Sequence, residues 1–473
     1  MSVKSNAEPN KARERFPWKL GSAAYVASYG LMFFFLNALF WDDWYTKMLP
    51  VELERSYWKN LGFPPPISFI IIDVFRRNAV VLHLAVFFMF FICGWLLFQI
   101  LQKIEMLTES DRRNIVLLFL VLPINSARVA MQMFNYSYSL LFFYLAWYLL
   151  TTKTSRWAKM ASIMFFVLSF QTLSFLVFLV LPAIHYLVQN QARYGKNARV
   201  TYLGPSFLLL IAPIYWITIK TVYPPKPSMR AYYSPTLSGT ARGLILLLIV
   251  TGLLICAGKR YLKVGDKRIL IIAVASLIIV LGAFPYMTSG RLVDLSEWMF
   301  NFVPRASEWD SRNQLLLGLG FAALLVGLFG DLDSQFKQHA FKVVIGTCVF
   351  LNFTYMQGYM LDARKQSEVI HLFANSETIK SGNVIMIHDL AVRYNARGRD
   401  VRTYEWNGML EKALGDTNRK SVNYGYIDCS NPDASIPDVL VTIDSSIGKF
   451  KSLLTNNVGI NMTATKISPC PAK

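Results

Sequence analysis

Two adjacent carboxylates occupy an unusual place in this chain, directly after its first long apolar run. Residues 39–50 read LFWDDWYTKMLP, so that Asp42 and Asp43 are enclosed by Trp41 and Trp44. A carboxylate can accept the proton of a hydroxyl group while that group attacks a carbon atom, which is general base catalysis. A single tryptophan followed by a charge would only mark the point at which a helix leaves a bilayer. Two carboxylates enclosed by tryptophans therefore need an explanation beyond the end of a helix.

Arginines form the second group of candidates, because a guanidinium group presents a planar set of donors that matches a phosphate. Arg128 lies in PINSARVAMQMFNYS between two apolar runs, where an isolated cation needs a protein carboxylate or a lipid phosphate as its partner. Arg76 and Arg77 end an apolar segment that follows three prolines at 64–66. Arg128, Arg76 and Arg77 are therefore cations at the membrane surface for which a partner has to be found.

A third concentration of charge lies in residues 288–313, again between two apolar runs. Its charged residues are Arg291, Asp294, Glu297, Arg305, Glu308, Asp310 and Arg312. Aromatic side chains such as Trp298 and Trp309 alternate with them. Arg305 and Arg312 are candidate phosphate ligands, and acids such as Glu308 and Asp310 would orient them or bind hydroxyl groups. The alternative interpretation is a solvated cluster of salt bridges.

Two other patterns carry little weight. Gly318-Leu319-Gly320 resembles part of a dinucleotide fingerprint, but it lies inside an apolar run with no preceding strand, so close helix packing explains it better. The five histidines are scattered over different segments, and no metal-ligand spacing emerges. We therefore predict no cofactor, with a divalent metal as the alternative.

Composition identifies the solvent around these residues. Hydrophobic residues make up 54% of the chain and charged residues 16%, and apolar runs of membrane-spanning length recur between residues 21 and 357. The net charge of +19 would suggest nucleic acid in a soluble chain, but the basic residues lie mostly in short segments between apolar runs. The sequence predicts a polytopic α-helical membrane protein whose partners are membrane lipids and no nucleic acid.

Eleven segments are candidate spans of a transmembrane domain that we place at residues 1–357. Two of them, 115–123 and 160–170, are shorter than the roughly 20 residues that a full span needs. The eleven segments are 20–41, 79–102, 115–123, 136–151, 160–170, 172–189, 203–219, 244–258, 269–287, 314–330 and 342–357.

The orientation follows from Lys and Arg, which concentrate in cytoplasmic loops. The N-terminal segment and the connections near 103–113, 153–159, 193–199 and 259–268 are basic. This pattern places the N-terminus in the cytoplasm, and the acidic pair, the segment 288–313 and everything after residue 358 outside. The predicted location is a bacterial inner membrane with a periplasmic C-terminal domain.

Residues 358–473 change character, since the long apolar runs end there. SGNVIMIHDL and PDVLVTID look like short buried strands and LEKAL like part of a helix, which predicts a small α/β domain. Cys429 and Cys470 are the only cysteines in this part of the chain. An oxidising compartment would allow them to form a disulfide, and two unpaired thiols are the alternative.

The first outer loop contains a second membrane-active segment. Apolar residues at 67, 70, 71, 74 and 75 follow the spacing of one helix face. This spacing predicts an amphipathic helix along the membrane surface. An early start of the next span is the alternative.

The chain resembles the GT-C superfamily of lipid-carrier-dependent glycosyltransferases. The resemblance lies in its outward-facing carboxylates, the interfacial segment behind them, the arginines at the same face and the soluble C-terminal domain. Members of that superfamily carry an acidic motif, often Asp-Asp, Asp-Glu or Asp-x-Asp, in the first extracytoplasmic loop. WDDW at 41–44 matches this motif in place and type. The nearest members in character are bacterial enzymes that modify surface polysaccharide, lipid A or pilin.

The resemblance implies a reaction and a set of roles. The donor would be a sugar on a polyprenyl phosphate, transferred with inversion to a hydroxyl group of a glycan, lipid or protein acceptor. Asp42 is the expected base, with Asp43 as the alternative or as its orienting partner. The leading ligands of the departing phosphate would be Arg128, Arg305 and Arg312, with Arg76 and Arg77 behind them. The competing functions are a polymerase or ligase of lipid-linked glycans, which would use residues 288–313, and a flippase or transporter of lipid-linked sugars.

Overall fold

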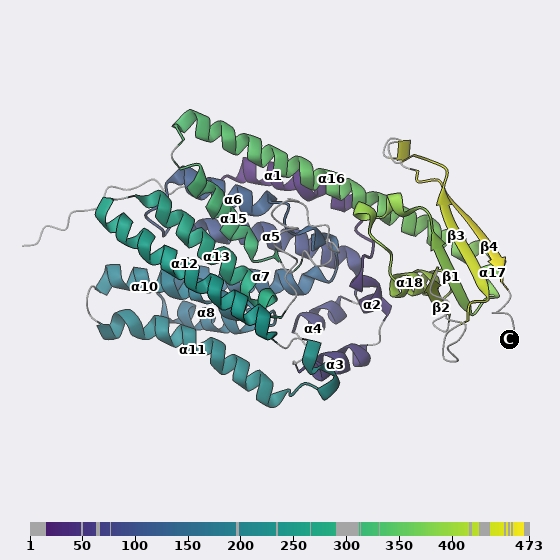
Figure 1. Ribbon diagram of the computed structural model, residues 1–473, viewed down its shortest axis with the longest axis horizontal. Coiled ribbons are helices and arrows are strands. Elements are labelled where there is room, and N and C mark those ends of the chain that lie inside the picture. Colours follow the sequence, from purple (N-terminus) through teal and green to yellow (C-terminus); the bar gives the residue numbers. More distant parts are fainter. Residues whose placement is uncertain are drawn as a thin grey trace, which may run out of the picture.

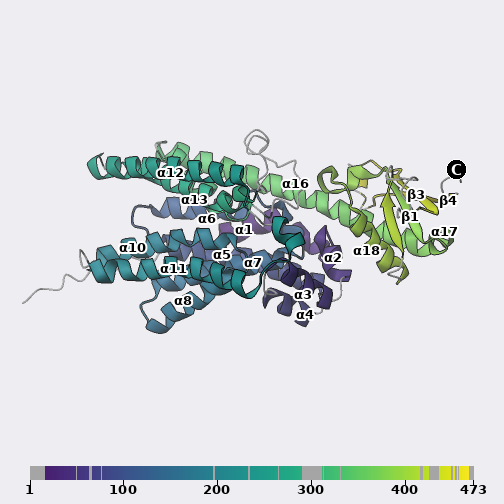
Figure 2. The ribbon, with the colours of Figure 1, turned by 60° about the horizontal axis from the view of Figure 1, so that its bottom comes forward.

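The molecule is a long helical bundle with a small β-sheet beyond one of its ends (Figure 1). Its computed structural model describes residues 16–48, 51–62, 67–75, 77–194, 198–232, 235–264, 266–289, 312, 314–330, 332–415, 419–424, 436–448, 451–452, 455 and 457–467. One helix, α16 (Ser334–Asn375), runs along the bundle and continues to the sheet, as a second view confirms (Figure 2). The two parts of the chain therefore share a helix.

Six stretches of helix within the described residues are long and apolar enough to cross a membrane, which makes this a membrane-embedded protein. They lie in α5 (Ala79–Leu101), α9 with α10 (Ser174–Phe178 and Val180–Tyr194), α11 (Ala198–Val222), α12 (Leu237–Val264), α13 (Lys267–Thr288) and α16.

The expected count of eleven spans is not met. The other five expected segments form helices that are shorter or more polar than these six: α1 (Trp18–Tyr29), α6 (Glu109–Val121), α7 (Met133–Thr152), α8 (Arg156–Ser169) and α15 (Leu317–Leu328). After Tyr29 the chain tightens into the 3-10 helix η1 (Gly30–Phe34). In α7 the length suffices, but Asn, Ser, Thr and Tyr side chains lower its mean hydropathy.

Helix α6 ends where proline makes continuation unfavourable. Pro123 disfavours helical backbone at Leu122, which adopts an extended ψ of 128°. The carbonyl groups left without helical partners are satisfied by side chains from elsewhere: Asn352 of α16 donates to Val121 at 2.6 Å, and Arg128 of η2 (Ser126–Val129) reaches Leu120 at 3.4 Å. These contacts join α6, α16 and the segment that leads into α7.

Three short helices follow the first apolar run: α2 (Asp42–Met48), α3 (Val51–Asn60) and α4 (Ile67–Val74). The expected amphipathic helix is present as α4, separated from α5 by a turn in which Arg77 has a φ of 52°. Ile70 and Val74 of α4 are exposed, whereas Ile72 is buried. This arrangement fits a helix whose apolar face meets lipid.

The C-terminal sheet contains four strands in the order β2-β1-β3-β4. The two predicted strand segments form its centre, β1 (Val384–Asp389) and β3 (Val439–Ser445), which pair in parallel. At the edges, β2 (Lys420–Asn423) pairs with β1 in parallel and β4 (Ile460–Lys466) pairs with β3 antiparallel. Ile385, Ile387, Val441 and Ile443 form the buried centre of this domain.

Two further helices accompany the sheet, α17 (Glu377–Lys380) and α18 (Thr403–Leu414), and α18 contains the predicted LEKAL segment. Short 3-10 turns η5 (Val392–Tyr394) and η6 (Ala396–Gly398) lead from β1 toward α18. Helix α18 packs against α16 and also against α2 of the membrane part. It is therefore the element that brings the C-terminal domain to the acidic pair.

Candidate active site

A strained turn starts the segment that carries the acidic pair. Trp41 has a φ of 49°, a left-handed conformation that side chains other than glycine rarely adopt. Its backbone N–H donates to Oε2 of Glu405 at 3.2 Å, and its ring lies edge-on to Tyr359 of α16. Contacts from the C-terminal domain and from α16 thus hold the turn that directs the next two side chains.

Asp43 is completely buried and acts on the backbone. Its Oδ2 accepts hydrogen bonds from the N–H groups of Phe40 at 3.1 Å and Met131 at 2.8 Å, and its Oδ1 accepts one from Gln132 at 2.8 Å. Burial raises the pKa of the Asp43 carboxyl to about 7, and the three backbone donors oppose that rise. Asp43 therefore fastens α2 to the start of α7.

Asp42 faces a different direction, because consecutive residues of a helix point about 100° apart. Its side chain is half-buried, and its Oδ1 accepts a hydrogen bond from the hydroxyl group of Tyr404 at 3.0 Å. Tyr404 lies in the first turn of α18, so the bond joins residues separated by 362 positions in the sequence. Of the two carboxylates, only Asp42 is partly exposed.

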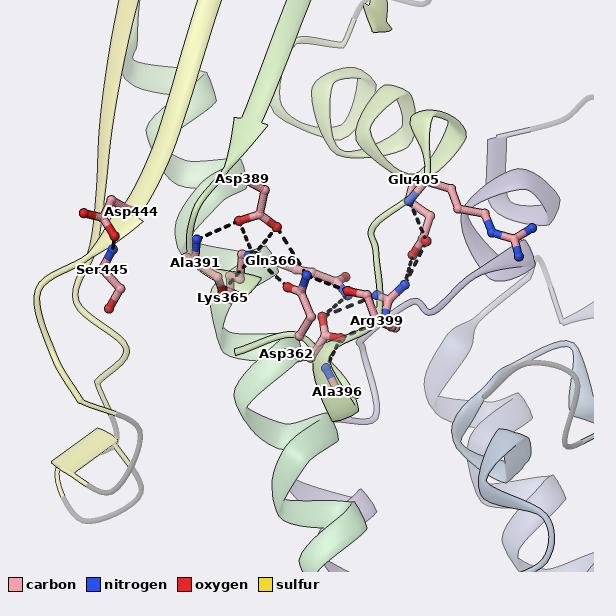
Figure 3. A network of polar contacts seen from close by, with 12 residues as sticks. Asp362, Lys365, Gln366, Asp389, Ala391, Ala396, Arg399, Glu405, Asp444 and Ser445 are labelled. Atoms are coloured by element: carbon pink, nitrogen blue, oxygen red, sulfur yellow. Dashed lines mark hydrogen bonds and ion pairs between the residues drawn. The ribbon is translucent and has the colours of Figure 1, made fainter. Parts of the chain in front are cut away.

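A buried ionic network holds α18 in this position (Figure 3). Arg399 lies between two carboxylates that are both fully buried: its Nε donates to Asp362 of α16 at 2.9 Å, and its Nη1 donates to both oxygens of Glu405 at 2.7 and 2.8 Å. A buried carboxylate that lost this partner would be strongly destabilising. The network fixes the start of α18 relative to the C-terminal part of α16.

A neighbouring network in the same region tightens the turn after β1 (Figure 3). Lys365 of α16 donates to Oδ2 of Asp389 at 2.6 Å and to Oδ1 of Asn395 at 2.6 Å. Asp389 also accepts from the backbone N–H of Ala391 at 3.0 Å. These groups satisfy one another, which is what burial requires of polar side chains.

The second tryptophan of the acidic motif packs directly on α18. Trp44 is almost fully buried, and a Cβ atom added to Gly408 would lie 2.6 Å from its Cε3. The ammonium group of Lys412 lies 5.7 Å from the centre of the same ring. Trp41 and Trp44 therefore bracket the acids because both tryptophans form the contact with the C-terminal domain.

Arg77 is held by protein groups. Its guanidinium group contacts Glu54 at 2.9 Å and Asp73 at 3.3 Å, and it donates to the carbonyl oxygen of Thr46. Lys47 in turn donates to the carbonyl oxygen of Arg77 at 3.1 Å. In this structure Arg77 ties α3 and α4 to α2.

Arg128 is buried in the bundle close to the segment that Asp43 binds. Its guanidinium carbon lies 4.6 Å from the ring centre of Tyr29 and 4.1 Å from that of Phe90, an arrangement in which aromatic faces attract a cation. Its Nε has no hydrogen-bond partner, and among the described residues no carboxylate pairs with it. Within the described part of the chain, the contacts of this cation are therefore two aromatic rings and a carbonyl group, and the expected carboxylate partner is not found there.

Most of the remaining predicted site residues lie outside the described part of the chain. Arg312 lies near Tyr286 of α13, whose hydroxyl group donates to Ser174 of α9 at 3.3 Å. Outside the described residues lie Arg76, Arg305, Glu308 and Asp310, together with the rest of the segment 290–311 and the cysteines at 429 and 470. Within the described ranges, no group of three or more His, Cys, Asp or Glu side chains could hold a metal ion.

Three residues of this site were not anticipated from the sequence: Tyr404, Glu405 and Arg399. Their partners Asp42, Trp41 and Asp362 are distant in the sequence or lie in another element, so no local spacing links them. The only local signal is Glu405 at the third position of α18, where it accepts from the backbone N–H of Arg402 and completes a helix cap. That pattern predicts a helix start and gives no information about a site.

Comparison of the chain with known protein families, with curated proteins and with solved structures gives no match.

Proposed function

We propose that the chain is an inverting glycosyltransferase of the GT-C type, which moves a sugar from a polyprenyl phosphate to a hydroxyl group of a glycan, lipid or protein. The site lies at the outer face of a bacterial inner membrane. The observation that carries the proposal is the difference in hydrogen bonding and exposure between Asp42 and Asp43. The buried carboxylate of Asp43 accepts hydrogen bonds from three backbone N–H groups, whereas Asp42 is half-exposed beside the C-terminal domain.

The reaction requires one base and a stabilised leaving group. The acceptor oxygen attacks the anomeric carbon, and Asp42 takes the hydroxyl proton. The bond between that carbon and the phosphate oxygen breaks, and its electron pair leaves with the polyprenyl phosphate. Cationic side chains stabilise the charge that develops on this phosphate. Asp43 orients the base by fixing the helix that carries it.

The arginines differ in their fitness for the phosphate. Arg77 already contacts two carboxylates, which lowers its value as an anion ligand. Arg128 keeps an unpartnered Nε but is 7% exposed, so only a group that enters the bundle would reach it. Arg312 is half-buried at the end of the predicted charged segment, and it and Arg305 are our preferred ligands.

The test is sugar release and transfer by the full-length protein in lipid nanodiscs. The donors are tritium-labelled hexosyl- and pentosyl-phosphoryl-undecaprenol, and the acceptor is water or a bacterial membrane fraction. Asp42→Asn keeps the volume of the side chain but cannot accept a proton. We expect its rate to fall by roughly 10²- to 10⁴-fold, with donor binding retained.

Asp400→Asn is the matched control, because Asp400 is exposed in the same region and makes no hydrogen bond or ion pair within the described structure. Its rate should equal that of the parent. Normal transfer by Asn at 42, at 43 and at both positions together would show that the pair only marks where the first helix leaves the membrane. Movement of the intact donor across the bilayer without cleavage would instead support a transporter.

A further inference from the structure

The C-terminal domain reaches into the proposed site through one hydroxyl group. We infer that Tyr404 is a positioning residue for Asp42, so that the C-terminal domain forms part of the active site. This inference rests on the proposed function, since it assigns Tyr404 a role through the proposed base. Its geometric basis is the bond from the Tyr404 hydroxyl group to Oδ1 of Asp42 at 3.0 Å.

A donor on one carboxylate oxygen restricts rotation of the whole group. Asp42 lies in the first turn of the seven-residue helix α2, and its side chain is only half-buried. Packing therefore covers only part of this side chain. The Tyr404 hydroxyl group fixes the plane of the carboxylate, and a base held in one orientation meets the acceptor hydroxyl group in a reactive geometry more often.

Tyr404 is suited to remain a donor. Burial, and then the charge of Asp42, raise the pKa of the Tyr404 hydroxyl group well above its usual range. The proton therefore stays on the tyrosine oxygen through neutral and mildly alkaline pH. The interaction keeps one direction, from tyrosine to carboxylate, under the conditions in which a carboxylate base works.

The backbone that carries Tyr404 is fixed on both sides of the contact. The next residue, Glu405, accepts from the N–H of Trp41, the residue that precedes Asp42. Glu405 is also bound by Arg399, which is bound by Asp362 of α16. Two successive residues of α18 therefore bind two successive residues of the acidic motif.

Close packing at the next turn of α18 supports the same contact. Gly408 leaves room for the ring of Trp44, and a side chain at this position would collide with it. The acidic motif is thus clamped along its length by α18, from Trp41 to Trp44. A domain that served only as an anchor would not need a hydroxyl group aimed at the half-exposed carboxylate.

The test compares Tyr404→Phe with the parent, using the undecaprenyl phosphate-linked sugar that the parent cleaves. The substitution removes one oxygen atom and keeps the ring. We expect kcat to fall by roughly 10- to 100-fold, the range for a lost hydrogen bond to a charged group, with the KM for the donor unchanged. Tyr424→Phe is the control, because Tyr424 is an exposed tyrosine of the same domain that stacks on His388.

A double variant separates positioning from an independent role. If Tyr404 acts through Asp42, then Asp42→Asn combined with Tyr404→Phe is no slower than Asp42→Asn alone. A loss in the double variant equal to the product of the two single losses overturns the inference. A normal kcat for Tyr404→Phe overturns it too, and a lowered thermal midpoint in that variant would then assign Tyr404 to domain docking alone.

The outcomes for the base and for the tyrosine are distinguishable. Full activity of Asp42→Asn, or no cleavage of any tested donor by the parent, contradicts the proposed function itself. An inactive Asp42→Asn together with a normal Tyr404→Phe leaves the proposed function intact and rejects only the positioning role.

Discussion

At the scale of single residues, the acidic pair shows how two identical side chains acquire different surroundings. The sequence identifies both as candidates, because type and place are visible in WDDW, but it cannot separate them. The separation comes from Met131 and Gln132, whose backbone N–H groups bind Asp43, and from Tyr404, which binds Asp42. All three partners lie more than 80 positions away, and no local rule predicts which carboxylate they select.

Asp43→Ala tests the structural role of the buried carboxylate. The substitution leaves three backbone N–H groups without an acceptor, of which those of Phe40 and Met131 are in buried surroundings. Each buried unsatisfied group costs about 1–3 kcal/mol, so the thermal midpoint in detergent should fall clearly. Asp42→Ala, at a half-buried position, should lower the midpoint much less.

The difference in stability between the parent and Asp43→Ala should change with pH in a definite direction. The folded chain holds the Asp43 proton up to about pH 7, whereas the ordinary value is 3.8. The contribution of Asp43 to the free energy of unfolding therefore falls as the pH rises through that window, and the alanine variant lacks this slope. The thermal midpoints of the parent and of Asp43→Ala should therefore approach each other as the pH rises through this window. If they move apart instead, the Asp43 carboxylate is bound in its charged form throughout.

At the scale of elements, local signals predict existence and type better than association. The apolar runs became helices, and SGNVIMIHDL and PDVLVTID became the central strands β1 and β3, because burial and periodicity act within each segment. The edge strands β2 and β4 were not predicted, since they are short or alternate between exposed and partly buried residues. The docking of α18 on α2 depends on Gly408, and a glycine inside a helix gives no sign of its partner.

Gly408→Ala tests this docking. In an exposed helix the change would stabilise the chain by roughly 0.5–1 kcal/mol, because alanine loses less backbone entropy than glycine. Here the added Cβ atom would lie 2.6 Å from the ring of Trp44, which is itself almost fully buried. We expect a lower thermal midpoint, and increased protease cleavage between α18 and the bundle.

Gly358→Ala is the matched control for this substitution. Gly358 lies inside α16, and a Cβ atom there would meet nothing within 4 Å. Its midpoint should stay equal or rise. Equal behaviour of the two alanine variants would mean that α18 tolerates a wider separation from α2, and that Trp44 does not define their distance.

At the scale of the whole molecule, charge and hydropathy give different counts of membrane crossings. Six long apolar helices would place residues 376–473 on the same side as the N-terminus, and Lys153 on the opposite side. The distribution of Lys and Arg requires the reverse at both points. Helices α6, α7 and α8 lie between α5 and α9 in the chain, and α7 packs against both α5 and α8. At least three of the shorter or more polar helices must therefore cross for the charge pattern to hold: one before Lys153, one between Lys153 and Arg199, and one between Arg268 and the C-terminal domain.

Reporter fusions decide between the two counts. We expect fusions after Lys153 and Arg199 to report the cytoplasm and a fusion after Lys473 to report the outside. Loops that carry Lys and Arg remain in the cytoplasm, and helices that are short or polar can cross when neighbouring helices cover their polar groups. An outside signal after Lys153 with a cytoplasmic signal after Lys473 would match the six long helices alone. That result would also put Asp42 and the C-terminal domain, which are in contact, on the cytoplasmic side of the membrane. An outward-facing glycosyltransferase site would then be untenable.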